Sequence, residues 1–352
     1  MSNPPCTSAV GIVINPLAGT DIRRLVSSAS PTTEMAKIGA IRRAVIGAIS
    51  GGARQILLTG DRRSLAERAL ERIERDLEPG LIDEVDTSIV EAPPYDHRDN
   101  TVDAARRLRN LGAGALVVFG GDGTHRDVVS GWREAPMVAV STGTNNVFPR
   151  AIETTLAGHA AAAVATGRVP LSDASWRAKV IDVEIQRADG RTESDLGLVD
   201  VALVASAFTG SRAVWHGDSL RHLIAAIAEP ASVGLSAIAA AAAPCGRREP
   251  GGVHVEFDPN LPTTRLTAPI APGRYATLGV ASHRRIATGE TVTVGGPGAL
   301  SFDGERDAVI GPDDHATLRV ANDGPHIIDV EVTMAAALHS QLPDDHTTPE
   351  QN

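Results

Sequence analysis

The chain has 352 residues, 42% of them hydrophobic and 22% charged, so it is long enough for two globular domains. Its formal net charge of -10 and aromatic content of 3% argue against a nucleic-acid partner, because phosphates attract cations and bases need stacking surfaces. The two cysteines, Cys6 and Cys245, argue against a disulfide framework and cannot by themselves form a four-ligand zinc site. No cationic, apolar leader opens the chain, and its longest apolar stretch, 223–243, contains Glu229 and Pro230. We therefore expect a cytoplasmic protein that is not stably inserted in a membrane.

The first 150 residues alternate between strand and helix patterns. Apolar runs predict strands at 10–14, 55–59, 87–90, 115–119 and 137–140. Apolar residues at helical spacing predict a first helix, with Ile38, Ile41, Val45 and Ile49 on one face and Gly51-Gly52 at its end. Further helices are expected from the capping-box pattern Ser64-Leu65-Ala66-Glu67, over 102–111, and from about Thr124. This alternation predicts a parallel sheet covered by helices, which binds ligands at the carboxyl ends of its strands.

After a helix near 152–166 the pattern changes to short strands separated by Gly, Pro and Asp turns. These strands are expected at 179–186, 198–205, 253–257, 276–281, 291–294, 299–302, 316–320 and 327–332, with one helical insertion at about 219–243. The predicted fold class is α/β plus all-β. A Rossmann-like parallel-sheet domain over 1–150 precedes a β-sandwich domain over 151–340. The last strand or helix of the second domain packs either within that domain or back on the first. Residues 341–352 are polar and expected to form a disordered tail.

The most informative segment is Gly120-Gly121-Asp122-Gly123-Thr124, which directly follows the apolar run 115–119. Glycines after a buried strand let the backbone turn and approach a ligand, and successive amide groups in such a turn bind phosphate. Phosphate repels a carboxylate, so Asp122 fits there only if it binds a cation or takes a proton from an attacking hydroxyl. A tight turn is the alternative for the string alone, but its position after a buried strand favours phosphoryl transfer.

Two more polar loops follow predicted strands of the same sheet. The loop after 137–140 carries Gly143, Thr144, Asn145 and Asn146, which suit either a nucleotide or the cap of the next helix. Asn15-Pro16 with Gly19 follows the first strand. Parallel strands bring their carboxyl ends to one edge, so the three loops together predict one ligand site.

Two other segments leave their interpretation open. Asp303-Gly304-Glu305 closes a predicted strand, and Asp-Gly favours a simple hairpin turn there. His125 and Arg126 follow the glycine-rich loop and either contact phosphate or begin a solvated helix.

Taken in order, four motifs resemble the superfamily of NAD kinases and diacylglycerol or sphingosine-type lipid kinases. They are Asn15-Pro16-x-x-Gly19, Gly120-Gly121-Asp122-Gly123-Thr124, Gly143-Thr144-Asn145-Asn146 and Asp303-Gly304-Glu305. The resemblance is greatest to the AcoX-like branch, the ATP-NAD-kinase-like proteins linked to acetoin catabolism, which 213–215 and 228–238 also resemble. It covers nearly all of residues 10–335, and the Gly-Gly-Asp-Gly-Thr motif is specific to the superfamily.

The resemblance implies an active site in the cleft between an α/β nucleotide domain and a β-sandwich domain. It implies that Asp122 deprotonates the acceptor hydroxyl or helps to organise Mg²⁺. The residues that it implies for the phosphates of ATP and the nucleotide site are Asn15, Gly120, Gly121, Gly123, Thr124, Gly143, Thr144, Asn145 and Asn146. Those implied for the acceptor are Asp200, Thr209, Gly210 and Ser211, and those implied for the metal are Asp303 and Glu305.

Three positions depart from the superfamily pattern. Val199 stands where NAD kinases carry asparagine, Arg212 stands where they carry a small hydroxylic residue, and Val147 replaces an acid of the lipid kinases. The resemblance therefore implies a retained catalytic centre with altered recognition of the acceptor.

Our first hypothesis is an ATP- and Mg²⁺-dependent kinase that phosphorylates a ribose hydroxyl of NAD or a related nucleotide, with polyphosphate as an alternative donor. A diacylglycerol-type lipid or small-alcohol kinase is the second, favoured by Asp303-Gly304-Glu305 and by the alanine-rich 223–243 stretch. The third is a nucleotide-sensing protein without turnover. Because homo-oligomers are common in the superfamily, we also expect a homo-oligomer.

Overall fold

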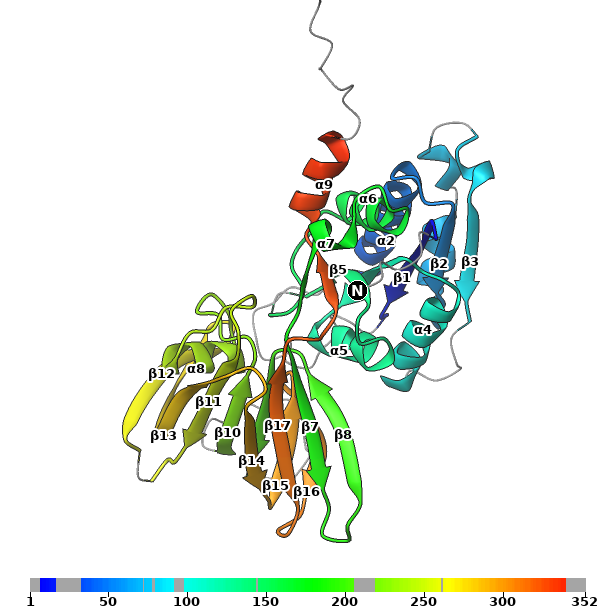
Figure 1. Ribbon diagram of the computed structural model, residues 1–352. Helices are drawn as coiled ribbons and strands as arrows, with labels where there is room; N and C mark the ends of the chain where they lie inside the picture. The colour runs from blue at the N-terminus through cyan, green and yellow to red at the C-terminus, as the bar shows by residue number, and fades with distance from the viewer. Residues whose placement is uncertain are drawn as a thin grey trace, which may run out of the picture.

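The computed structural model describes residues 7–16, 33–71, 73–77, 80–91, 98–143, 145–205, 219–260 and 262–339 (Figure 1). They form a domain of helices around a mostly parallel sheet and a second domain of antiparallel strands. The predicted fold class is thereby confirmed. Within these residues, no helix is both long and apolar enough to cross a lipid bilayer.

The α/β domain contains one seven-stranded sheet with the order β3-β2-β1-β4-β5-β18-β6. Its strands are β1 (Ala9–Ile14), β2 (Gln55–Thr59), β3 (Asp86–Val90), β4 (Ala115–Gly120), β5 (Pro136–Ser141), β6 (Ser175–Arg177) and β18 (His326–Ile328). Its helices are α2 (Glu34–Ser50), α3 (Leu65–Leu70), α4 (Arg98–Asn110), α5 (Asp122–Gly131), α6 (Thr154–Ala165), α7 (Leu171–Ala174) and α9 (Val330–His339), with 3₁₀ turns at Ile73–Arg75 and Ile82–Glu84.

Helices cover both faces of this sheet, which explains the uninterrupted apolar sequence of its central strands. Every residue of β1 and β4 is buried. On one face α2 and α6 cover side chains such as Ile12 and Val117, and on the other α4 and α5 cover side chains such as Val13 and Val118. The helices α2 and α6 pack closely, because a Cβ at Gly158 would lie 1.9 Å from the carbonyl oxygen of Ala44. Because β4 pairs in parallel with both β1 and β5, the carboxyl ends of these three strands share one edge of the sheet.

The all-β domain contains two antiparallel sheets with a core between them. The larger, ordered β12-β13-β11-β10-β9-β15-β16, consists of β9 (Asp200–Val204), β10 (Leu220–Ala225), β11 (Gly252–Phe257), β12 (Thr264–Ala271), β13 (Arg274–Ile286), β15 (Gly298–Phe302) and β16 (Glu305–Ile310). The smaller, ordered β14-β17-β7-β8, consists of β7 (Val180–Gln186), β8 (Thr192–Gly197), β14 (Thr291–Gly295) and β17 (His315–Ala321). Helix α8 (Leu235–Ala242) packs on the outer face of the larger sheet.

Both chain regions that flank the all-β domain belong to the α/β sheet. Strand β6 pairs with β18, and β18 in turn pairs in parallel with β5. The sheet order therefore places 151–177 with the first domain and moves the expected boundary at 150 to about 178. Helix α9 follows β18, and its Ala337 packs in the core of the α/β domain.

Three local predictions differ from the structure. The expected helix at 219–243 is strand β10 followed by the shorter α8, because 220–225 pairs on both sides with β9 and β11. The expected strand at 327–332 ends at Ile328, where Asp329 begins α9 by accepting from the backbone of Val332 and Thr333. The capping box at Ser64 does not form, since Ser64 has φ 51° and Asp61 caps the helix instead.

Candidate active site

The polar loops after β1, β4 and β5 meet at the carboxyl edge of the sheet. The Nδ2 of Asn15 donates to Thr124 Oγ1 at 2.8 Å, and its backbone N–H donates to the carbonyl of Phe119. The backbone N–H of Thr142 donates to the carbonyl of Gly120. These contacts bring together the three segments that the sequence predicts at one site. Thr144 and Gly19, predicted in the same loops, lie outside the described residues.

Glycine is required at the turn from β4 into α5. A Cβ at Gly120 would lie 2.3 Å from the Cβ of Thr124, far inside van der Waals contact. A Cβ at Gly121 would lie 3.0 Å from the Oδ1 of Asn146. The turn therefore packs directly against Thr124 in the first turn of α5 and against Asn146 of the loop after β5, and α5 begins immediately after it at Asp122.

Asp122 is held in place by the loop after β5. Its Oδ1 accepts hydrogen bonds from the backbone N–H groups of Val147 and Phe148 at 3.1 and 2.9 Å, and its Oδ2 accepts from Val147 at 3.2 Å. The same loop is stiffened by Ser141, whose Oγ accepts from Asn146 Nδ2 at 2.8 Å. The carboxylate is thus fixed at the first turn of α5, where the helix dipole favours negative charge.

The all-β domain brings its acidic motif to the glycine-rich loop through the hairpin of β15 and β16. The Oε1 of Glu305 lies 4.0 Å from the position that a Cβ would take at Gly123. Asp303 points elsewhere: its Oδ1 accepts from the consecutive amides of Leu198, Val199 and Asp200 at 3.0, 2.8 and 3.2 Å. Burial raises the pKa of Asp303, against the lowering effects of Arg126 and these amides. The hairpin alternative from the sequence is therefore what forms, and it also delivers Glu305 to the loop.

His125 and Arg126 are interior residues, so neither begins a solvated helix. His125 is fully buried against Phe148, its Nδ1 lies 2.8 Å from the carbonyl oxygen of Gly121, and burial lowers its pKa to about 4. Arg126 has 2% exposure, lies over the Phe302 ring and donates to the Phe302 carbonyl at 3.3 Å. His125 thus contacts the glycine-rich loop, and Arg126 joins α5 to the hairpin that carries Glu305.

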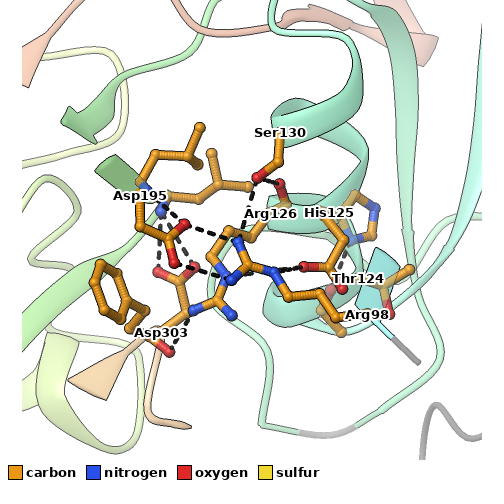
Figure 2. Close-up of polar contacts among 12 residues, drawn as sticks. Arg98, Thr124, His125, Arg126, Ser130, Asp195 and Asp303 are labelled. Atoms are coloured by element: carbon orange, nitrogen blue, oxygen red, sulfur yellow. Dashed lines mark hydrogen bonds and ion pairs between the residues drawn. The ribbon is translucent and has the colours of Figure 1, made fainter. Parts of the chain in front are cut away.

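Arg98 joins the two domains next to helix α5 (Figure 2). Its Nη1 and Nη2 donate to the two carboxylate oxygens of Asp195 in β8 at 2.9 and 2.7 Å, and its Nε donates to Asp127 in α5 at 2.7 Å. Burial would raise the pKa of Asp195, but the hydrogen bonds from Arg98 lower it below its ordinary value. Burial raises the pKa of Asp127 to about 7, despite the nearby charges of Arg126 and Arg98.

An open cleft of about 990 Å³ also lies between the domains. Arg98, Ser130 and Asp195 line it, together with Asp182 and Arg319 of the smaller sheet, whereas Asp122, Asn146 and Glu305 are not among its lining residues. In the described part of the chain, no group of three His, Cys, Asp or Glu side chains is arranged to hold a metal ion. Of the predicted acceptor residues, Asp200 is buried at the start of β9, while Thr209, Gly210 and Ser211 lie outside the described residues.

Sequence reasoning missed two residues that shape the site. Arg247 follows α8 and donates to the carbonyls of Val147 and Phe148, the residues whose amides hold Asp122. Glu229 binds the guanidinium of Arg247 in a fork. Glu229 lies in the 228–238 segment that carries the family resemblance, but that segment gave it no role. Arg247 lies in no local motif, because its contacts with Val147 and Phe148 join segments about a hundred positions apart in the chain.

Comparison with known proteins agrees with this architecture. Residues 61–172 match the diacylglycerol kinase catalytic domain, and residues 179–323 match the C-terminal domain of acetoin catabolism protein X. A yeast NADH kinase solved in complex with NADH superposes with a TM-score of 0.53 at 13% identity, covering 98% of this chain and 90% of that chain. The fold and the glycine-rich loop therefore define a kinase-like protein of the NAD kinase and diacylglycerol kinase superfamily.

The family follows from a much closer sequence match. Acetoin catabolism protein X of Cupriavidus necator is 35% identical over 331 residues, which cover 93% of this chain and 92% of that protein. The chain belongs to the acetoin catabolism protein X family.

Proposed function

We propose that this protein is an ATP- and Mg²⁺-dependent phosphotransferase that phosphorylates a ribose hydroxyl of NAD or a related nucleotide. The observation that carries the proposal is the position of Asp122, fixed at the edge where the loops after β1, β4 and β5 converge, with Glu305 of the other domain beside the same loop. Ligands bind at this edge in open α/β sheets, and phosphate binds at helix N-termini. The fold shared with a yeast NADH kinase supports a nucleotide as acceptor.

Each loop has a part in this proposal. Asn15 and the turn from Gly120 to Thr124 hold the phosphates of ATP through backbone and side-chain donors. The loop after β5 lines the nucleotide, and the Oδ1 of Asn145 supports this role: it is buried without a hydrogen-bond partner among the described residues, so it is available to a ligand donor. Gly143, Thr144 and Asn146 belong to the same loop. Asp200, Thr209, Gly210 and Ser211 are proposed to face the acceptor.

The available donors suit Mg²⁺, which binds oxygen and is usually held by one or two carboxylates together with substrate phosphates. Glu305 would be such a ligand, and organising the ion is the alternative to the role of Asp122 as a base. The carboxylate of Asp303 is occupied by three amides, so its proposed role is to position the hairpin that carries Glu305. When bound, Mg²⁺ would neutralise charge on the phosphates.

The chemical role of Asp122 is proton transfer. As the ribose hydroxyl oxygen bonds to the terminal phosphorus of ATP, its proton passes to the Asp122 carboxylate, and the bond from that phosphorus to the bridging oxygen of ADP breaks. The amides of Val147 and Phe148 keep the carboxylate in the orientation needed to accept this proton.

An assay of purified protein with ATP, Mg²⁺ and NAD tests the proposal by measuring NADP formation. Asp122→Asn is expected to lower kcat by about 10²–10⁴-fold, the usual contribution of a general base. Asp189→Asn is a matched control, because Asp189 also accepts from a backbone amide but lies in the exposed turn between β7 and β8. Absence of NADP with both ATP and polyphosphate, or full activity of Asp122→Asn, would refute the proposal.

The match to the diacylglycerol kinase catalytic domain keeps a lipid or small-alcohol acceptor as the second candidate. The argument for a lipid from the alanine-rich 223–243 stretch is weaker in the structure. Helix α8 buries Ile238, Ala239 and Ala240 against the larger sheet and does not present them to a lipid. Diacylglycerol in mixed micelles, offered in the same assay, distinguishes the two acceptors. Tight nucleotide binding with no ATP consumption on any acceptor would instead favour the nucleotide-sensing function.

A further inference from the structure

The loop that holds Asp122 is itself held by the all-β domain. Arg247 donates from Nη2 to the carbonyl of Val147 at 2.8 Å and from Nη1 to the carbonyl of Phe148 at 3.0 Å. The carbonyl of Val147 and the N–H of Phe148 belong to the same peptide group. Arg247 therefore binds one side of this peptide group, while Asp122 binds the other at 2.9 Å.

Arg247 is fixed before it reaches that peptide. Glu229 accepts from its Nε at 2.8 Å and from its Nη2 at 3.0 Å, a forked arrangement that fixes the plane of the guanidinium. Reciprocal backbone hydrogen bonds between Ala228 and Cys245 keep the two segments side by side. The buried ammonium of Lys179 donates to the carbonyl of Gly246, the residue before Arg247. The side chain that crosses the domain boundary is thus rigid, and it is only 15% exposed.

A positive charge at the carbonyl end of a peptide group polarises it and strengthens the hydrogen bond that its N–H donates. The guanidinium of Arg247 supplies that charge. The Asp122 carboxylate therefore receives a stronger and better directed hydrogen bond from Phe148 than it would without Arg247. Removing the guanidinium would leave two carbonyls without their charged donor and loosen the peptide that orients Asp122.

We propose that Arg247, held by Glu229, is a positioning residue through which the all-β domain orients the Asp122 carboxylate for phosphoryl transfer. This inference rests on the proposed function for its kinetic consequence, but its structural part does not. The orientation of the Asp122 carboxylate therefore depends on a side chain of the other domain.

Amide hydrogen exchange measured by mass spectrometry tests the structural part. Residue 149 is proline, so a proteolytic peptide spanning 145–149 reports only on the amides of Val147 and Phe148, the first two positions being lost to back-exchange. Arg247→Gln is expected to raise their exchange rate by about tenfold, as the loss of a charge-assisted hydrogen bond predicts. Asp122→Asn is expected to raise the same rates. The double variant is expected to raise them by less than the product of the two single effects, since the two side chains act on one peptide group.

The matched control is Arg248→Gln. Arg248 is the next residue, donates to Asp329 and stacks on Trp176 of the α/β domain, and so forms another contact across the boundary without touching the Asp122 loop. It is expected to change the exchange rates by less than about twofold. Arg247→Lys keeps the charge but not the fork and should fall between Arg247→Gln and the unmodified protein. Circular dichroism verifies that each variant is folded.

The kinetic part is expected as a split between kcat and KM. Arg247→Gln should lower kcat by about 10–100-fold, as loss of a supporting partner usually does, while KM for ATP changes by less than about twofold. Exchange rates in Arg247→Gln equal to those of Arg248→Gln would overturn the inference whether or not the protein is a kinase. If the unmodified protein shows no kinase activity but Arg247→Gln raises the amide exchange rates, the positioning contact stands and only the proposed function is rejected. Equal loss of kcat in both variants would reject the specific role of Arg247.

Discussion

Replacement of Asp303 separates an architectural role from direct contact with a metal. The Asp303 side chain is 6% exposed, and its carboxylate is bound by the consecutive amides of Leu198, Val199 and Asp200. Asp303→Ala would leave all three buried donors without this acceptor, and each such donor costs about 1–3 kcal/mol. Alanine would also be strained by about 1 kcal/mol at the observed φ of 51°.

Not all of this cost is realised, because the turn relaxes and water enters. We expect Asp303→Ala to lower the free energy of unfolding by about 3–5 kcal/mol, the usual loss when one partner of a buried charged arrangement is removed. Asp303→Asn keeps an oxygen at the position of Oδ1 and tolerates a positive φ, so it should cost only about 1–2 kcal/mol. The difference between the two variants measures the three amide hydrogen bonds.

Urea unfolding followed by circular dichroism gives these free energies. Asp189→Ala is the control, since its carboxylate accepts from Arg191 in an exposed turn and its loss should leave the free energy of unfolding nearly unchanged. A loss below about 1 kcal/mol for Asp303→Ala would show that the three amides do not depend on it. In that case the reasoning that assigns Asp303 to the architecture, and Glu305 to the site, would fail.

Three further predictions follow from close contacts and burial. Gly120→Ala should push Thr124 out of place and weaken ATP binding at least about tenfold, measured by thermal shift, and unchanged binding would contradict the role of the turn. Gly158→Ala should destabilise the α/β domain by about 2–3 kcal/mol, whereas Gly39→Ala, on the open side of α2, should be neutral or stabilising in the same urea titration. Burial raises the pKa of Asp127 from 3.8 to about 7, so between about pH 4 and pH 7 the folded protein binds a proton there that the unfolded chain does not. Stability should therefore fall as pH rises from about 4 to about 7, and melting temperatures of Asp127→Asn should lack that slope; parallel curves would rule out the burial effect.

The parts of the fold that the sequence predicted best are those determined by local pattern and burial. The run 115–119 is buried on both faces, so it contains no polar residue and ends where the backbone must turn, at Gly120. Convergence of the loops at Asn15, Gly120 and Asn146 was predictable because neighbouring parallel strands end at a common edge. Sequence patterns therefore indicated the location of the candidate site as well as the fold class.

The parts that could not be predicted depend on contacts between distant segments. The sequence predicts a helix over 219–243, yet Leu223 and Ile224 lie in a strand whose two faces are both buried, which removes the alternation that identifies strands. Asp303 binds amides about a hundred residues earlier in the chain, and Arg247 binds carbonyls at a similar separation. No local motif signals such contacts, so the residues that support Asp122 required the structure.

The return of β18 to the α/β sheet has a consequence for how the protein is made. Strand β18 lies between β5 and β6, and β6 has no other neighbour among the described strands. A nascent chain that has emerged only as far as residue 177 has an unpaired edge at β5 and nothing to hold β6. The α/β domain therefore reaches its final form only after the ribosome has delivered residues 326–328, far later than its other strands. Shortening the gene from its 3′ end would damage the domain encoded at its 5′ end.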